Sequence, residues 1–164
     1  MDEVDRIVAA WRHERPDLDV SPMEILSRVT RLSRQLDLAR RASFTDYGIE
    51  VWAFDVLSAL RRSGEPYQLS PSSLLQETLV TSGTMTNRID RLVAAGWVER
   101  LPDPDDRRGV LVRLTESGRV TVDNALAELL EREQEILGDL TPAQQRKLAS
   151  LLRVLSTGFD ADAD

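Results

Sequence analysis

Six polar side chains between residues 81 and 91 carry groups that hydrogen-bond to nucleobases and phosphates. An asparagine can pair with adenine and an arginine with guanine, while short hydroxyl side chains suit phosphate oxygens. Met85, Ile89 and Leu92 repeat among them at helical spacing and predict the buried face of the same helix. The pattern indicates contacts with DNA, and the alternative is an ordinary solvated helix face. The six residues are Thr81, Ser82, Thr84, Asn87, Arg88 and Arg91.

Two further arginines, Arg107 and Arg108, lie in the loop PDPDDRRG between two segments with strand-like alternation. A guanidinium at a protruding hairpin tip can enter a narrow minor groove, where the potential is most negative. We expect Arg108 to contact DNA and Arg107 to be at least partly structural, because one neighbouring aspartate can pair with an arginine and stiffen the loop. The alternative is a solvated charged turn.

A third candidate is the carboxylate of Asp55, which interrupts the apolar run VWAFDVL. A carboxylate among apolar side chains is costly unless an arginine or a ligand pairs with it. Asp55 is therefore either one half of an internal salt bridge or part of a ligand-binding site.

Helices are expected to position these groups. Apolar residues at helical spacing predict helices over residues 2–14, 22–42 and 46–62. Ser21 is expected to cap the second helix, with Pro22 at its first position and Glu24 completing a capping box. A short helix over residues 71–77 and a turn at residues 81–83 then precede the reading helix, which is predicted to end at Gly96.

Two strands, residues 97–101 and 110–114, and two helices from about residues 116 and 142 complete the prediction. The expected fold is mainly α with a small β-hairpin wing. It divides into N-terminal helices for dimerisation and one pocket wall (1–45), a winged helix-turn-helix (46–114), and C-terminal dimerisation helices with an acidic tail (115–164). These parts form one intertwined domain. Broad apolar faces on the flanking helices predict a homodimer.

Composition excludes several classes of function. Net charge is −7, but residues 70–114 hold six basic and six acidic groups, so the acidity lies outside the reading segment and permits DNA binding. There is no cysteine and one histidine, His13, so we expect no disulfide, metal or cofactor. The chain has no Gly-rich phosphate loop or nucleophile–base set, which argues against an enzyme. No apolar run suits a membrane span and the start MDEVDR lacks a signal peptide's basic segment, so a cytoplasmic protein is expected.

The segments SGTMTNRIDRLVAAG and GWVERLPDPDDRRGVLVRLTESG resemble the multiple-antibiotic-resistance regulator (MarR) family of winged-helix transcription factors. The wing pattern D-x-x-D-R-R-G-x-x-V-x-L-T is the more specific part. The resemblance implies a homodimer that binds a pseudo-palindromic operator in double-stranded DNA, usually as a repressor. It also implies release from DNA when a small aromatic or phenolic acid occupies a crevice between the dimerisation and reading parts.

Trp11, ahead of the long second helix, resembles the extra first helix of the urate-responsive (PecS- and HucR-like) branch of that family. The resemblance implies a ligand site made by Trp11, Asp55, Arg88 and Arg100. These groups suit a planar purine anion, which needs an aromatic surface, a guanidinium and an acceptor for its N–H groups. Each also has a plainer role in packing, a salt bridge or phosphate contact. Two alternatives stay open: the same repressor answering a phenolic or aromatic carboxylate, or a winged-helix protein-interaction module without DNA binding.

Overall fold

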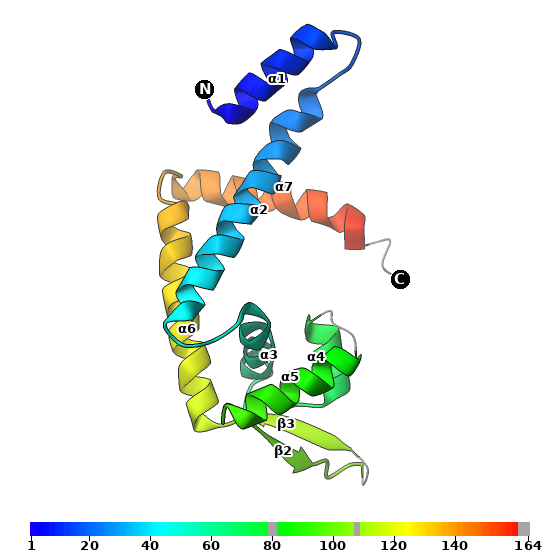
Figure 1. Ribbon diagram of the computed structural model, residues 1–164, viewed down its shortest axis with the longest axis vertical. Helices are drawn as coiled ribbons and strands as arrows, with labels where there is room; N and C mark the ends of the chain where they lie inside the picture. The colour runs from blue at the N-terminus through cyan, green and yellow to red at the C-terminus, as the bar shows by residue number, and fades with distance from the viewer. Residues whose placement is uncertain (79–81, 107–108, 161–164) are drawn as a thin grey trace.

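The computed structural model describes residues 1–78, 82–106 and 109–160. Two long helices, α2 (Ser21–Thr45) and α6 (Glu116–Ile136), pack against each other and join the two ends of the molecule (Figure 1). One end carries α1 (Glu3–Glu14), α7 (Pro142–Asp160) crosses beside the middle of α2, and the other end carries the remaining helices and the sheet. The expected class, mainly α with a small β wing, is confirmed.

The sheet end begins with α3 (Val51–Arg62), α4 (Pro71–Thr78) and α5 (Ser82–Ala94). Strands β2 (Val98–Pro102) and β3 (Val110–Leu114) form the predicted antiparallel hairpin, in register from Val98 opposite Leu114 to Pro102 opposite Val110. A third strand, β1 (Gln68–Leu69), pairs with the other edge of β3 and was not predicted. Two residues are too few to show the alternation that identifies a strand.

The main core lies between α3, α4, α5, α6 and the sheet. Met85, Ile89 and Leu92 of α5 are each 1% exposed, as their spacing predicted. They pack with Leu57 and Leu60 of α3, which are fully buried. This packing turns the polar residues of α5 outward. Gly96, with φ of +75°, ends the helix as expected, and the Trp97 N–H donates to the Leu92 carbonyl.

Two predicted features of the first long helices are wrong. Ser21 is the first residue of α2 rather than its cap, because its N–H and hydroxyl both donate to Asp19. The predicted start of the third helix at Asp46 is also wrong. The chain makes a turn through Gly48 (φ +63°), and Glu50 is extended, so α3 begins at Val51. Helical periodicity did not reveal this break because apolar residues continue through it.

The junction of the wing with α6 depends on a close backbone approach. Thr115 caps α6 by accepting a hydrogen bond from the Gly118 N–H at 3.0 Å, and its hydroxyl donates to the Gly96 carbonyl at 2.7 Å. A Cβ on Gly118 would lie 2.0 Å from the carbonyl oxygen of Trp97. Only glycine allows α6 to start there. The last helix begins as expected, since the Gln144 side chain accepts from the Thr141 N–H at 2.8 Å.

Apolar side chains remain open to solvent on α2, α6 and α7. A groove of about 490 Å³ between these three helices is lined by Leu32 of α2, Leu129 of α6 and Leu152 of α7, among others. Val154 is 71% exposed and Leu151 55%. None of the helices in the described ranges is both long and apolar enough to cross a membrane. The described parts of α2, α6 and α7 therefore present a large apolar surface.

Candidate nucleic-acid interface and effector clefts

Helix α5 presents a polar face in its first turns. Thr84 and Asn87 are exposed, and Arg88 is half-buried at the edge of the same face. Ser82 begins the helix. Thr81 lies outside the described residues, as do Arg107 and Arg108 of the wing. The described part of this face therefore has the groups expected of a reading helix.

The wing loop folds back on itself near the strand ends. The Asp103 N–H donates to the Gly109 carbonyl at 3.1 Å, and the Gly109 N–H donates to the Asp106 carbonyl at 2.8 Å. A Cβ on Gly109 would lie 2.8 Å from the Cβ of Asp103, so glycine suits this turn. The aspartate–arginine pairing expected in the loop involves residues outside the described ranges and stays a prediction.

Arg91, expected to contact DNA, is held against α3. Its guanidinium lies 4.6 Å from the centre of the Trp52 ring and forms an ion pair with Glu50. The Trp52 indole N–H also donates to Glu50. The hydrogen bond from Trp52 is the largest cause, and that from Arg91 the second, of the lowered pKa of the Glu50 carboxyl. Arg88 reaches the same ring, 5.4 Å from its centre. Glu50 and Trp52 are functional candidates that the sequence analysis missed.

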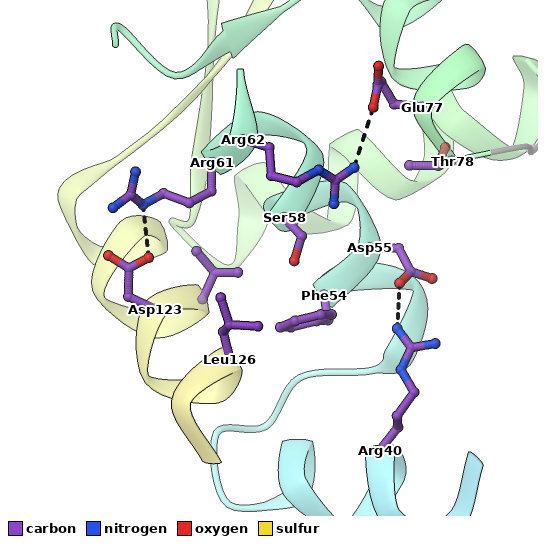
Figure 2. Close-up of a pocket in the computed structure, with 11 residues that line it drawn as sticks. Arg40, Phe54, Asp55, Ser58, Arg61, Arg62, Glu77, Thr78, Asp123 and Leu126 are labelled. Carbon is purple, nitrogen blue, oxygen red and sulfur yellow. Dashed lines mark hydrogen bonds and ion pairs between the residues drawn. The ribbon is translucent and has the colours of Figure 1, made fainter. Parts of the chain in front are cut away.

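Asp55 forms an ion pair with Arg40 of α2 at 2.8 Å (Figure 2). The salt-bridge interpretation of this residue is confirmed, although its side chain is 43% exposed and so not deep in the core. Asp55 turns away from the apolar face of α3 toward the end of α2. The Arg40 guanidinium also lies within about 6 Å of the Phe44 and Phe54 rings, which stack on each other.

Two clefts open on either side of Asp55. The α3–α6 cleft, of about 320 Å³, has an apolar floor made by Phe54, Val122 and Leu126 (Figure 2). Ion pairs form its rim, Arg61 with Asp123 at 2.8 Å and Arg62 with Glu77 at 3.3 Å. The hydroxyl of Ser58 faces this cleft and is buried, and within the described ranges it has no hydrogen-bond partner. The full lining is Arg40, Phe54, Asp55, Ser58, Arg61, Arg62, Glu77, Thr78, Val122, Asp123 and Leu126.

The second cleft, here the α3–α5 cleft, has a volume of about 560 Å³. It brings together Asp55 and Arg88, two of the four expected ligand residues. Both of its carboxylates are already paired, Asp55 with Arg40 and Glu50 with Arg91. Its two arginines, Arg41 and Arg88, have no ion-pair partner among the described residues, so the cleft has an excess of positive charge. The lining is Arg41, Ile49, Glu50, Val51, Trp52, Asp55 and Arg88.

Trp11 and Arg100 do not line this cleft within one chain. Trp11 is 47% exposed on α1, which packs at the far end of α2 from α3 (Figure 1). Arg100 of β2 forms an ion pair with Asp90 of α5 at 2.8 Å. Half of the expected ligand constellation is therefore assembled in a single chain. Trp52 is the aromatic side chain that lines this cleft.

Comparison with known proteins identifies the family. The sequence profile described as the MarR family matches residues 47–109, the segment from the turn before α3 to the end of the wing loop. The HTH-type transcriptional regulator PecS of Dickeya dadantii is 39% identical over 150 residues, which cover 92% of this chain and 90% of PecS. The chain belongs to the MarR family. The fold agrees, since a structure of an Escherichia coli MarR mutant complexed with operator DNA matches with a TM-score of 0.69 and 30% identity, over 84% of this chain and 99% of that one.

A second solved relative bears on ligands. The structure of Bordetella bronchiseptica BpsR, whose DNA binding is regulated by 6-hydroxynicotinic acid, matches with a TM-score of 0.68 and 29% identity over 85% of this chain and 94% of that one. MarR-family homologues are DNA-binding transcriptional regulators that respond to small molecules. The chain is accordingly a winged-helix regulator and not an enzyme. Among the described residues, no group of three or more acidic or histidine side chains is arranged to hold a metal.

Proposed function

We propose that the protein is a homodimeric repressor that leaves a pseudo-palindromic operator when urate or a related purine anion enters the α3–α5 cleft. The observation that carries the proposal is the meeting of Arg88, from the reading helix, with Asp55 and Arg41 in that one cleft. A ligand bound there would contact a residue that also faces DNA. Such a shared residue gives a direct thermodynamic coupling between effector and operator.

The proposed DNA contacts come from two elements. Helix α5 enters the major groove, and the wing reaches the adjacent minor groove. Because Glu50 and Trp52 already engage Arg91, it is left out of the reading set. The reading set is Thr81, Ser82, Thr84, Asn87, Arg88, Arg107 and Arg108.

The proposed dimer is supported by the open apolar faces of α2, α6 and α7. Leucines and valines that are about half exposed are unusual over several helices of a monomer, and a two-fold partner would cover them. A two-fold axis would also present two reading helices to two half-sites, as a palindrome requires. Within one chain Trp11 and Arg100 lie outside the cleft, so their expected ligand roles require the second copy or a movement of β2.

The α3–α5 cleft suits a planar purine anion in three respects. Arg41 and Arg88 supply guanidiniums that are free to pair with anionic oxygens. The Asp55 carboxylate can accept a hydrogen bond from a ligand N–H. Trp52 offers a ring for stacking. A purine that pairs with Arg88 would withdraw that side chain from DNA and weaken operator binding.

A second candidate is an aromatic carboxylate in the α3–α6 cleft. Its apolar floor, the unpartnered Ser58 hydroxyl and the arginines at its rim fit a small ring with one carboxylate. Regulation of BpsR by 6-hydroxynicotinic acid, a compound of this class, favours the same candidate. The two clefts share Asp55, so a ligand in either would disturb the Arg40–Asp55 pair.

The test is a fluorescence-anisotropy titration of the full chain onto its own upstream intergenic DNA, alone and with urate or 6-hydroxynicotinate. We expect salt-sensitive binding that urate reverses. In the variant Arg41→Gln, urate should release the DNA at a concentration roughly tenfold higher, since one charge-assisted pair is lost. The matched control Arg113→Gln removes an arginine paired with Glu99 in the wing sheet, away from both clefts, and should respond to urate like the wild type. Release by 6-hydroxynicotinate alone, unchanged by Arg41→Gln, would move the site to the α3–α6 cleft.

A further inference from the structure

We propose that Glu50 and Trp52 form a seat for helix α5, and that Arg91 is a positioning residue held by this seat rather than a DNA contact. The inference rests on the proposed function in one respect, that α5 is the reading helix. It concerns how the angle of that helix is fixed, and it assigns roles to residues outside the reading set.

The seat engages Arg91 in two ways at once. The guanidinium carbon lies over the Trp52 ring, 4.6 Å from its centre, and the guanidinium also pairs with the Glu50 carboxylate. A planar, delocalised cation can stack on a ring and bind a carboxylate together, which a lysine ammonium cannot. The Trp52 indole N–H donates to the same carboxylate and fixes its orientation. Three side chains are thus locked to one another across the α3–α5 boundary.

The position of Glu50 explains why its carboxylate is available. Glu50 is the N-cap of α3, yet its side chain makes no capping hydrogen bond. Instead it binds Trp52 and Arg91, near the helix N-terminus where a negative charge is favoured. If Arg91 left to bind a phosphate, the Glu50 carboxylate would lose its cation close to the DNA backbone. Electrostatics therefore favours Arg91 staying on the protein.

The seat and the α3–α5 cleft share residues. Glu50 and Trp52 line the cleft, and Arg88 contacts the Trp52 ring at 5.4 Å. A planar anion stacked on Trp52 would compete with both arginines for one aromatic surface. Cleft occupancy would then reach α5 at two points one helical turn apart, at Arg88 directly and at Arg91 through its seat.

The test uses hydrogen–deuterium exchange of the full chain without DNA, so it does not depend on operator binding. We expect Arg91→Gln and Trp52→Leu each to raise amide exchange in α5 by roughly threefold or more while α6 stays protected. Because both variants break the shared Arg91–Trp52 contact, the double variant should raise exchange by less than the product of the two single effects. Trp52→Phe, which keeps a ring for Arg91, should fall between Trp52→Leu and the wild type, and it guards against a folding failure of Trp52→Leu.

The control is Arg119→Gln, which removes an arginine paired with Glu116 on α6. The proposed role of the seat would be wrong if Arg91→Gln left amide exchange in α5 at the wild-type rate. It would also be wrong if Arg119→Gln raised that exchange equally. A second measurement is the salt dependence of DNA binding. Arg91→Gln should keep the wild-type slope, whereas loss of a direct phosphate contact would lower it by about one. A wild-type protein that binds no DNA would refute the proposed function, while the exchange experiment would still decide the seat.

Discussion

Asp55 stands at the wall shared by two clefts, and its charge is balanced by Arg40 from another helix. A half-exposed ion pair of this kind contributes little to folding, about 0–1 kcal/mol. The pair links the end of α2 to α3. A ligand that competes for either partner would loosen that contact at small cost.

Replacing Asp55 by asparagine tests this role. The variant Asp55→Asn should fold with a loss of at most about 1 kcal/mol in urea denaturation. It should bind operator DNA like the wild type and need roughly tenfold more urate for release, because the neutral amide is a weaker acceptor than a carboxylate. Glu116→Gln, an equally conservative change on α6, is the control. A large loss of stability in Asp55→Asn would instead show that Asp55 has a structural role and not a ligand-binding one.

At the scale of residues, local patterns predicted only part of the site. The spacing of Met85, Ile89 and Leu92 fixed the orientation of α5, and the odd carboxylate in an apolar run pointed to Asp55. The seat could not be predicted, because Glu50 and Arg91 are 41 residues apart and meet only after α3 and α5 pack. Arg41 was missed for a related reason, since nothing local distinguishes it from the other arginines of its helix.

At the scale of elements, the junction between the wing and α6 depends on Gly118. An added methyl group would meet the Trp97 carbonyl oxygen at 2.0 Å, and that oxygen already accepts the Thr115 N–H. We expect Gly118→Ala to lower the free energy of unfolding by about 1–3 kcal/mol in urea denaturation. The control Gly158→Ala, with open space at its Cβ in α7, should be neutral or stabilising by up to about 1 kcal/mol. An equal change in the free energy of unfolding for the two variants would contradict the close approach of Gly118 to the Trp97 carbonyl oxygen.

Helix α1 is fastened to α2 by acidic residues whose titration should be measurable. Asp2 and Asp5 accept each other's backbone N–H groups and then the Arg28 guanidinium, and these bonds lower the pKa of both carboxyls. Aspartates in the unfolded chain titrate at about 3.9. Because the folded pKa lies lower, these interactions stabilise the protein fully above about pH 4, and the stabilisation is lost as the pH falls below that value through the folded pKa.

The variant Arg28→Gln should therefore be less stable than the wild type at pH 7, and the difference should shrink as the pH falls below about 4 and vanish below the folded pKa of the two aspartates. Chemical denaturation followed by circular dichroism at several pH values would measure the difference. Arg34→Gln is the matched control on the same helix, because no carboxylate of the described residues pairs with Arg34. A stability difference that stays constant as the pH falls from 7 to about 2 would show that the ion pairs with Asp2 and Asp5 are not its cause.

At the scale of elements, periodicity predicted helix type better than helix ends. The break between α2 and α3 was missed because the turn at Gly48 lies inside an apolar stretch. Ser21 failed as a cap because Asp19, two residues earlier, competes for its N–H. Ser70 succeeded in the same role, since its hydroxyl accepts the Ser73 N–H at 3.1 Å. Capping thus depends on nearby side chains that a motif does not include.

At the scale of the whole molecule, the proposed dimer makes a separate prediction. Val154 is the most exposed of the leucine and valine side chains of α7, at 71%. A glutamate there would bury a charge in the proposed interface, which is strongly unfavourable. We expect Val154→Glu to be monomeric by light scattering and to bind operator DNA at least about tenfold more weakly, since it engages one half-site. Val120→Glu, at the opposite end of α6, should stay dimeric. A dimeric Val154→Glu would place the interface elsewhere.

The length of α6 has a mechanical consequence. This helix runs from the wing junction to α7, and its 21 residues span roughly 32 Å. One end of α6 lies in the proposed dimer interface, and its other end carries the wing and α5, so α6 would work as a lever between them. A tilt of about 5° at one end displaces the other by roughly 3 Å, close to the 3.4 Å step between base pairs. In the proposed dimer, an effector would need to produce only a small rotation to put the two copies of α5 out of register with their half-sites.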